Sequence, residues 1–354
     1  MRKINIFLMY SATILVFLLT LSSCEHRPLV DLNELHYVRI YLDERLRNVN
    51  FGFYDETKEK PEYTTPQIMR VVLYEPSNGR VVAERYLRER GMDEKGNYLH
   101  GYISAPAGTY NLLAYNFDTQ ALRIRDDKWC YHMEAYTIPV SETVMDKLVS
   151  SRTNKDEDYE EILNEPEHFF VKNSEWIGIE LTDKVDTLKN SDGSDLVATS
   201  IVKTYYMQVN VKGVEYVRSA VALITGMAGS VRVYDGELNA DNPASIYFPL
   251  KNDVSKMRTN DNIAVAYATF NTFGKLHNRE GYIYITFEFN TIWGTVQTEN
   301  IKVTDMFETQ QVRENQWIII DKVIEIKPPE GEETTGGMSP GVNNWKEVEG
   351  GITL

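Results

Sequence analysis

Cysteine is almost absent from this chain, which has only Cys24 and Cys130. Beyond Cys24 there is no second thiol for Cys130 to pair with, so we expect no intramolecular disulfide and a fold stabilised by packing alone. Cys130 lies between Trp129 and Tyr131 in a run typical of a strand. This setting favours a small buried side chain over a reactive thiol.

Catalytic motifs are also missing. The chain has no glycine-rich phosphate loop and no Gly-x-Ser-x-Gly turn, and the acidic stretches at 126–127 and 192–195 lack a twelve-residue calcium loop. Two carboxylates suffice for glycoside hydrolysis, but no pair stands out. The histidines are scattered, with no two at metal-ligand spacing: His26, His36, His100, His132, His168 and His277. We therefore predict no enzyme, no metal and no cofactor.

Positively charged residues are fewer than negatively charged ones. Lys and Arg number 37 against 52 Asp and Glu, which gives a net charge of -15. Such an acidic chain argues against nucleic acid as a partner, and against binding to anionic lipid through the protein surface. Apolar residues make up 42% and charged residues 25%, as in ordinary globular proteins.

A long apolar run occurs at the start of the chain. Arg2 and Lys3 precede an apolar stretch at 4–21, and Ser22 and Ser23 lead directly into Cys24. The order of a basic, an apolar and a small-residue region predicts a signal peptide over residues 1–23. A transmembrane anchor is the alternative, because about 18 apolar residues can just span a bilayer. The serine pair and the polar stretch after Cys24 favour the signal peptide, followed by a tether at 24–34.

The remaining chain is rich in aromatic side chains, with 22 tyrosines. Aromatic rings pack well on a pleated, half-buried surface, so this composition favours strands. Alternation and turn signals predict a first domain at 35–190. Its predicted strands cover 36–42, 68–74, 81–86, 98–103, 111–117, 169–171 and 177–181. Asn78-Gly79 predicts a tight hairpin turn between the second and third of these strands.

A short helical insertion is predicted inside this first domain. Ser141 is placed as the N-cap of a helix at 141–148, with the acidic Glu142 in the first turn. A second helical turn is predicted at 159–163, which Pro166 would end.

The stretch at 190–195 is small, polar and contains glycine, which predicts a linker. A second domain at 196–327 follows, with turn signals between short strands and no helical pattern, as expected of a β-sandwich. Its predicted strands cover 204–211, 231–234, 245–249, 263–270, 282–289, 297–303 and 317–326. A Pro/Gly-rich break and a C-terminal segment occupy 328–354.

Three motifs point to a family. They are Ser104-Ala-Pro-Ala-Gly-Thr-Tyr-Asn-Leu-Leu-Ala-Tyr-Asn-Phe117, Ala222-Leu-Ile-Thr-Gly-Met-Ala-Gly-Ser-Val231 and Ala268-Thr-Phe-Asn-Thr-Phe-Gly274. With a start at 21–24 that resembles a lipobox, they resemble the fimbrillin-like lipoproteins of Gram-negative anaerobes of Bacteroidales type, in their uncharacterised DUF branch. The resemblance implies an all-β fold of two tandem transthyretin-like β-sandwich domains, and an anchor or accessory subunit of type V pili.

The resemblance also implies site residues. Cys24 would carry the lipid, and a protease would cleave after Arg45 or Arg47 if the first strand were removed. The C-terminal segment would supply a donor strand or cover an edge through its apolar residues Val342, Trp345, Val348, Ile352 and Leu354. Asp186-Thr187-Leu188 resembles the O-glycosylation signal of these anaerobes, with Thr187 as acceptor.

Two functions follow from these patterns. The first is an outer-membrane, lipid-anchored pilus anchor or adhesive accessory subunit that meets other fimbrillin-like subunits by strand exchange, on the cell surface or the periplasmic face. The alternative is a surface polysaccharide-binding lipoprotein that captures glycan on exposed rings such as Trp129 or Trp293. Apolar ring faces can stack on sugars, but the alternating strands place aromatics on both faces, which favours the first function.

Overall fold

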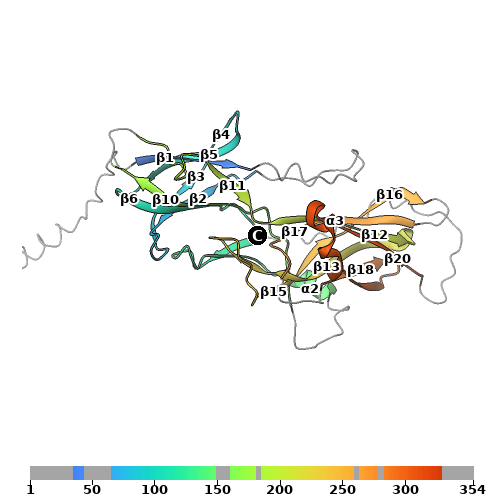
Figure 1. Cartoon of the computed structure of the whole chain (residues 1–354). Helices are drawn as coiled ribbons and strands as arrows, with labels where there is room; N and C mark the ends of the chain where they lie inside the picture. The colour runs from blue at the N-terminus through green and yellow to red at the C-terminus, as the bar shows by residue number, and fades with distance from the viewer. Residues whose placement is uncertain are drawn as a thin grey trace, which may run out of the picture.

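The structure is a computed structural model that describes residues 35–43, 65–148, 160–180, 185–258, 263–276 and 283–328. Almost all of its elements are strands, and they form two lobes side by side (Figure 1). The predicted all-β sandwich class is confirmed. The transthyretin-like topology of the two units stays a prediction.

The first lobe is a single sheet of eight strands in the order β3-β2-β6-β10-β11-β1-β5-β4. Strands β3 and β5 contact each other, so the sheet folds over and encloses a core that includes Ile40, Leu99 and Phe170. The strands are β1 (Leu35–Leu42), β2 (Met69–Tyr74), β3 (Val81–Leu87), β4 (Glu89–Asp93), β5 (Gly96–Ser104), β6 (Gly108–Asn116), β10 (Phe170–Ile179) and β11 (Leu196–Ser200).

The second lobe is a sandwich of two sheets. One has the order β16-β17-β12-β20, with β12 (Lys203–Lys212), β16 (Lys251–Arg258), β17 (Ile263–Thr272) and β20 (Trp317–Glu325). The other has the order β19-β18-β13-β15-β9, with β9 (Glu161–Leu163), β13 (Val217–Ala228), β15 (Pro243–Pro249), β18 (Tyr284–Thr291) and β19 (Val296–Lys302). Phe248 of β15 and Phe270 of β17 stack across the core with ring centroids 4.3 Å apart.

Short helical turns close the ends of this sandwich. They are η4 (Val214–Tyr216), η5 (Thr304–Glu308) and α3 (Gln310–Asn315). The Thr309 hydroxyl accepts a hydrogen bond from the Val312 N–H and caps α3, and Gln316 ends the helix in the left-handed region.

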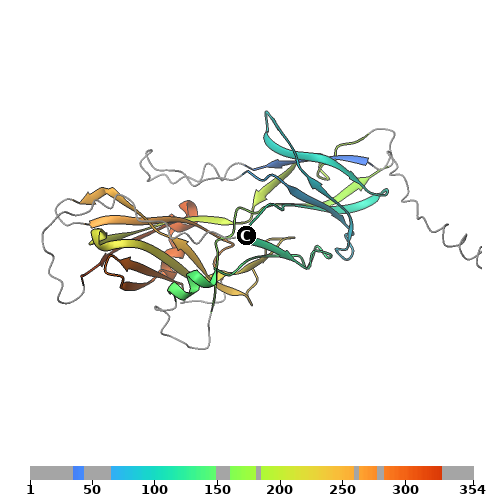
Figure 2. The same ribbon diagram turned by 180° about the vertical axis from the view of Figure 1, so that it is seen from behind.

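Residues 118–148 cross from the first lobe to the second, and residues 160–168 lead back to the first. They contain β7 (Leu122–Arg125), β8 (Glu134–Thr137), the helix α2 (Glu142–Leu148) and β9. Strand β8 pairs with β14 (Ser230–Arg232), and β9 pairs in parallel with β15. Figures 1 and 2 show α2 lying against the second lobe, where Val144 and Leu148 pack near Val221 and Leu223.

The two lobes share a third core. The outer face of the first sheet contributes Tyr74, Leu113 and Phe169, and Val231 and Phe273 meet them from the second lobe. Cys130 lies in this core, fully buried, and burial raises the pKa of its thiol to about 12. The prediction of an inert buried side chain at Cys130 therefore agrees with its surroundings.

Several sequence-based assignments need correction. Residues 161–163 form β9 rather than a helical turn, because Ile162 and Leu163 bury their side chains and their backbone pairs with β15. Strand β10 is continuous where two strands were expected, with a bulge between Ser174 and Ile177. The predicted helix at 141–148 is confirmed as α2.

The sheets also divide the chain differently from the expected limits. Strand β11 belongs to the first sheet, so residue 196 falls inside the first lobe rather than at the start of the second. The predicted linker at 190–195 is the turn that leads into β11. Strand β13 is not among the predicted strands, because ten of its twelve residues are buried and the run shows no alternation.

Candidate functional site

Strand β1, the first described element, lies inside the first sheet rather than at its edge. It runs antiparallel to β5 on one side and parallel to β11 on the other (Figure 1). Its inward residues Val38, Ile40 and Leu42 are buried in the core. Burial of each such side chain contributes about 1.5–3 kcal/mol, so β1 is a structural part of the lobe.

The opposite face of β1 carries a second set of contacts. Period-two alternation turns Tyr37, Arg39 and Tyr41 outward. The pairing with β5 sets Tyr102, His100 and Tyr98 directly opposite these three residues. Neighbouring rings lie 5.4–5.6 Å apart between centroids and are tilted or edge-on to one another. We call these six residues the β1–β5 outer face.

Arg39 lies at the centre of this face. Its guanidinium carbon is 4.5 Å from the ring centroid of Tyr98 and 5.7 Å from that of Tyr37. Such distances allow cation–π attraction to more than one ring. Arg39 Nη1 also donates to the Tyr41 hydroxyl at 3.0 Å.

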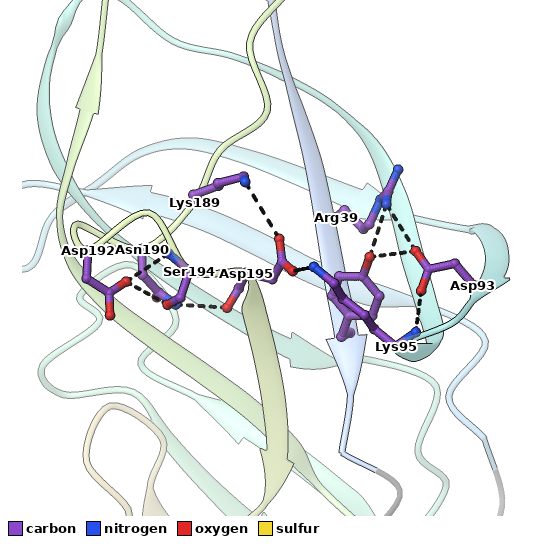
Figure 3. A network of polar contacts seen from close by, with 9 residues as sticks. Arg39, Asp93, Lys95, Lys189, Asn190, Asp192, Ser194 and Asp195 are labelled. Atoms are coloured by element: carbon purple, nitrogen blue, oxygen red, sulfur yellow. Dashed lines mark hydrogen bonds and ion pairs between the residues drawn. The ribbon is translucent and has the colours of Figure 1, made fainter.

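Asp93, at the end of β4, joins the same network, as Figure 3 shows. Its carboxylate accepts a hydrogen bond from the Tyr41 hydroxyl at 2.7 Å and forms an ion pair with Arg39 at 3.2 Å. The hydrogen bond from Tyr41 lowers the pKa of Asp93, and the Arg39 charge adds to this effect. Burial and the hydrogen bond to Asp93 raise the pKa of Tyr41. The network ties β1 to the β4–β5 hairpin.

A second set of contacts ties this hairpin to the start of β11. Lys95 forms an ion pair with Asp195, and Lys189 lies 4.0 Å from the same carboxylate (Figure 3). Asn190 donates to the Asp195 carbonyl at 2.9 Å, and Ser194 Oγ donates to Asp192 at 2.6 Å. Asp192 therefore stabilises the turn. Among the residues that the structure describes, no cluster of His, Cys, Asp and Glu could hold a metal ion.

Thr187, the predicted glycosylation site, lies beside this face. It bridges to Tyr37 in parallel register, because Tyr37 N–H donates to the Asp186 carbonyl at 2.9 Å and Leu188 N–H donates to the Tyr37 carbonyl at 2.8 Å. Leu188 is buried, whereas Thr187 is exposed. Paired residues project to the same side of a sheet, so Thr187, Tyr37 and Tyr102 form one row.

The other predicted site residues lie outside the described residues: Cys24, Arg45, Arg47, Val342, Trp345, Val348, Ile352 and Leu354. The two tryptophans proposed as sugar platforms lie in different places. Trp129 is half exposed near the β2–β3 turn, and Trp293 packs against Tyr216. The β1–β5 outer face was not predicted, although Tyr37, Tyr41, Tyr98 and Tyr102 already alternate along their strands.

Comparison with known proteins identifies the family. Residues 23–249 match the family model DUF5119, a domain of unknown function. The chain belongs to the DUF5119 family. This membership confirms the expected uncharacterised DUF branch of fimbrillin-like proteins.

Relatives of this DUF5119 chain are named for fimbriae and adhesion. A Bacteroides ovatus protein with the name "Putative fimbrium anchoring subunit Fim4B" is 24% identical, over 93% of this chain and 92% of its own length. A crystal structure of a "putative adhesin" from Bacteroides ovatus is also 24% identical and covers 88% of this chain and 99% of its own, with a TM-score of 0.53, which shows a shared fold.

A third match is the fimbrial anchor protein Mfa2 from Porphyromonas gingivalis. It is 14% identical and has a TM-score of 0.45, with 82% of this chain and 90% of Mfa2 covered. These names describe fimbrial and adhesive proteins rather than enzymes.

Proposed function

We propose that this chain is a cell-surface lipoprotein of the fimbrillin superfamily that serves as an anchor or accessory subunit of a type V pilus. The observation that carries the proposal is the position of β1, which lies inside the first sheet and is held on both faces. The Bacteroides ovatus protein with the name "Putative fimbrium anchoring subunit Fim4B", similar over nearly the whole length of both chains, supports the same role.

The position of β1 bears on cleavage at Arg45 or Arg47. Cleavage there would separate β1, with the proposed lipid on Cys24, from the rest of the protein. Loss of β1 would leave the backbone groups of β5 and β11 unpaired and open an apolar groove between them. A donor strand from a partner could fill such a groove by β-augmentation. A subunit that keeps β1 keeps its lipid and ends the fibre at the membrane.

We propose attachment to the outer membrane through acylated Cys24. Several acyl chains on one residue supply the multiple signals that stable anchoring requires. In the part of the chain that the structure describes, no helix is long and apolar enough to cross a bilayer. The partner contact is assigned to the C-terminal segment with Val342, Trp345 and Leu354, as donor strand or edge cover.

Mass spectrometry of the protein isolated from its native outer membrane tests this function. We expect an acylated Cys24 on a chain with β1 intact, and higher-mass assemblies on unheated denaturing gels that disappear when residues 342–354 are removed. An Arg45→Ala, Arg47→Ala double variant is the control, because it should keep the same amino terminus and lipid as the native protein, with a mass that differs only by the two substitutions. A mature amino terminus after Arg45 or Arg47, or a strictly monomeric lipoprotein, contradicts the anchor role.

Thr187 is proposed as the O-glycan acceptor, since it is exposed at the surface of the first lobe. Intact-mass measurement should show a glycan that the Thr187→Ala variant lacks. Thr199→Ala, at an exposed threonine on β11, is the matched control and should keep the glycan. An unmodified native mass would show that Thr187 is an ordinary loop residue.

A further inference from the structure

The β1–β5 outer face has the composition of a binding surface. Tyr37, Tyr98 and Tyr102 expose part of their rings on one side of the sheet, and Tyr102 is 51% exposed. Tyrosine combines an apolar ring with a hydroxyl that donates and accepts hydrogen bonds, so such a face can contact ring carbons and hydroxyl groups of a ligand at once.

Two of the rings, those of Tyr98 and Tyr41, are held in place before any ligand arrives. Tyr98 lies over the backbone of β4, where a Cβ on Gly91 would approach its ring to 2.3 Å, and Arg39 lies over its face. Tyr41 is fixed by Arg39 and Asp93. Tyr98 and Tyr41 therefore lose little side-chain entropy when a ligand binds beside them, which favours affinity.

The charges on this face compensate one another. Arg39 pairs with Asp93, and Lys95 beside the face pairs with Asp195. The whole chain is strongly acidic, with a net charge of -15. An anionic ligand would be repelled by this net negative charge, and Arg39, the one permanently charged cation among the six described residues of this face, is already paired with Asp93. A neutral ligand would not be repelled.

We propose that the β1–β5 outer face binds a neutral polysaccharide, whose sugar rings stack on Tyr102 and Tyr37 while their hydroxyl groups meet the polar groups between the rings. A sugar chain fits this arrangement, because its apolar ring faces can meet the exposed tyrosine rings while its hydroxyl groups meet the Arg39–His100 pair, which lies between the two tyrosine rows. This binding is independent of whether the protein anchors a pilus.

Affinity gel electrophoresis of the lipidated full chain in detergent tests the proposal. The probes are soluble neutral polysaccharides, namely β-1,3-glucan, β-1,4-linked xyloglucan and α-mannan, with the acidic alginate as comparator. We expect at least one neutral polysaccharide, and not alginate, to retard the protein. Tyr102→Ala should weaken binding about tenfold, while Tyr102→Phe, which keeps the ring, should retain most of it.

The matched control is Phe117→Ala, which removes another half-exposed ring, at the end of β6 on the first lobe. This variant should bind like the native protein. Thermal unfolding of each variant checks that the fold is kept, and Tyr102→Phe tests the face even where Tyr102→Ala is unstable. No retardation by any neutral polysaccharide, preference for alginate, or an equal loss in Phe117→Ala overturns the proposal.

Discussion

Strand β1 and the crossing segment, residues 118–148 and 160–168, are held in place by different kinds of contact. β1 is paired on both sides and contributes apolar residues to a closed core. The crossing segment makes short pairings, such as the three-residue β9, and attaches to the second lobe through several carboxylates as well as through apolar contacts of α2 and β9. The fold of the first lobe therefore depends on β1, whereas the crossing segment joins the two lobes.

Three glutamates illustrate the attachment of the crossing segment. Glu160 accepts hydrogen bonds from the Gly226 N–H and the Ser245 hydroxyl, each at 3.0 Å. Glu165 accepts from the Asn271 N–H at 2.8 Å. Glu134 accepts from Ser230 and Asn239, both in the second lobe. Hydrogen bonds from backbone amides to carboxylates are directional but individually modest, so this attachment should respond to pH and to single substitutions.

The largest expected effect compares one isoleucine in each region. Ile40 of β1 and Ile162 of β9 are both almost fully buried. Ile40→Ala should lower the free energy of unfolding by about 4 kcal/mol, since paired strands on both sides keep the cavity from collapsing. Ile162→Ala should cost about 2 kcal/mol, because the short edge strand can move inward. Urea denaturation measures both free energies of unfolding. A larger loss for Ile162→Ala than for Ile40→Ala would contradict the view that the fold depends more on β1 than on the crossing segment.

The next effect concerns Glu165 and pH. Burial raises the pKa of its carboxyl to about 8, against a smaller lowering by the Asn271 N–H. Between the unfolded pKa near 4.5 and the folded value, the folded state binds more protons than the unfolded state, so stability falls as pH rises through this window. We expect a loss on the order of 2 kcal/mol from pH 5 to pH 8.

Glu165→Gln removes this titration and keeps an oxygen that can accept from Asn271. The variant should therefore have a flatter pH profile and be more stable than the native protein at pH 8. Glu161→Gln, at an exposed residue of β9, is the control and should keep the native profile. If the stability of Glu165→Gln and that of the native protein changed in parallel over pH 5–8, the titration of Glu165 would not explain the pH dependence.

A smaller and more local effect is expected at Glu160. Glu160→Ala leaves the Gly226 N–H and the Ser245 hydroxyl without this acceptor, which should cost about 1 kcal/mol. Hydrogen exchange should become faster at Ile162 and Gly226 and stay unchanged at Ile40, because the opening is confined to the β9 edge. Faster exchange throughout both lobes would show that the crossing segment is essential to the whole fold.

The smallest effect is expected at Asp93 on the outer face. Asp93→Asn weakens the contacts to Arg39 and Tyr41, but both charged partners are partly exposed and their ion pair is screened by salt. We expect a slight drop in the thermal midpoint at low salt and none at high salt. A large drop at both salt concentrations would mean that the outer face, as well as the core, holds β1 in the sheet.

Much of the fold could be predicted from local pattern. The predicted strand at 36–42 matches β1, and the predicted hairpin turn at Asn78-Gly79 is present, with Gly79 at a φ of 78°. In both places the information lies in neighbouring residues, either as alternation or as a residue suited to a positive φ. Strand β13 was missed because both of its faces are covered, so its sequence carries no alternation.

By itself, the sequence determined the all-β class, the short helix α2, the buried character of Cys130 and the family resemblance. Each depends on composition, on local periodicity or on a motif within a few residues. Only the tertiary structure decided that the crossing segment reaches the second lobe, that β11 completes the first sheet, and that rings from β1 and β5 meet around Arg39. Those features depend on pairing between residues that are distant in the chain. The local pattern of one strand does not identify the strand with which it pairs.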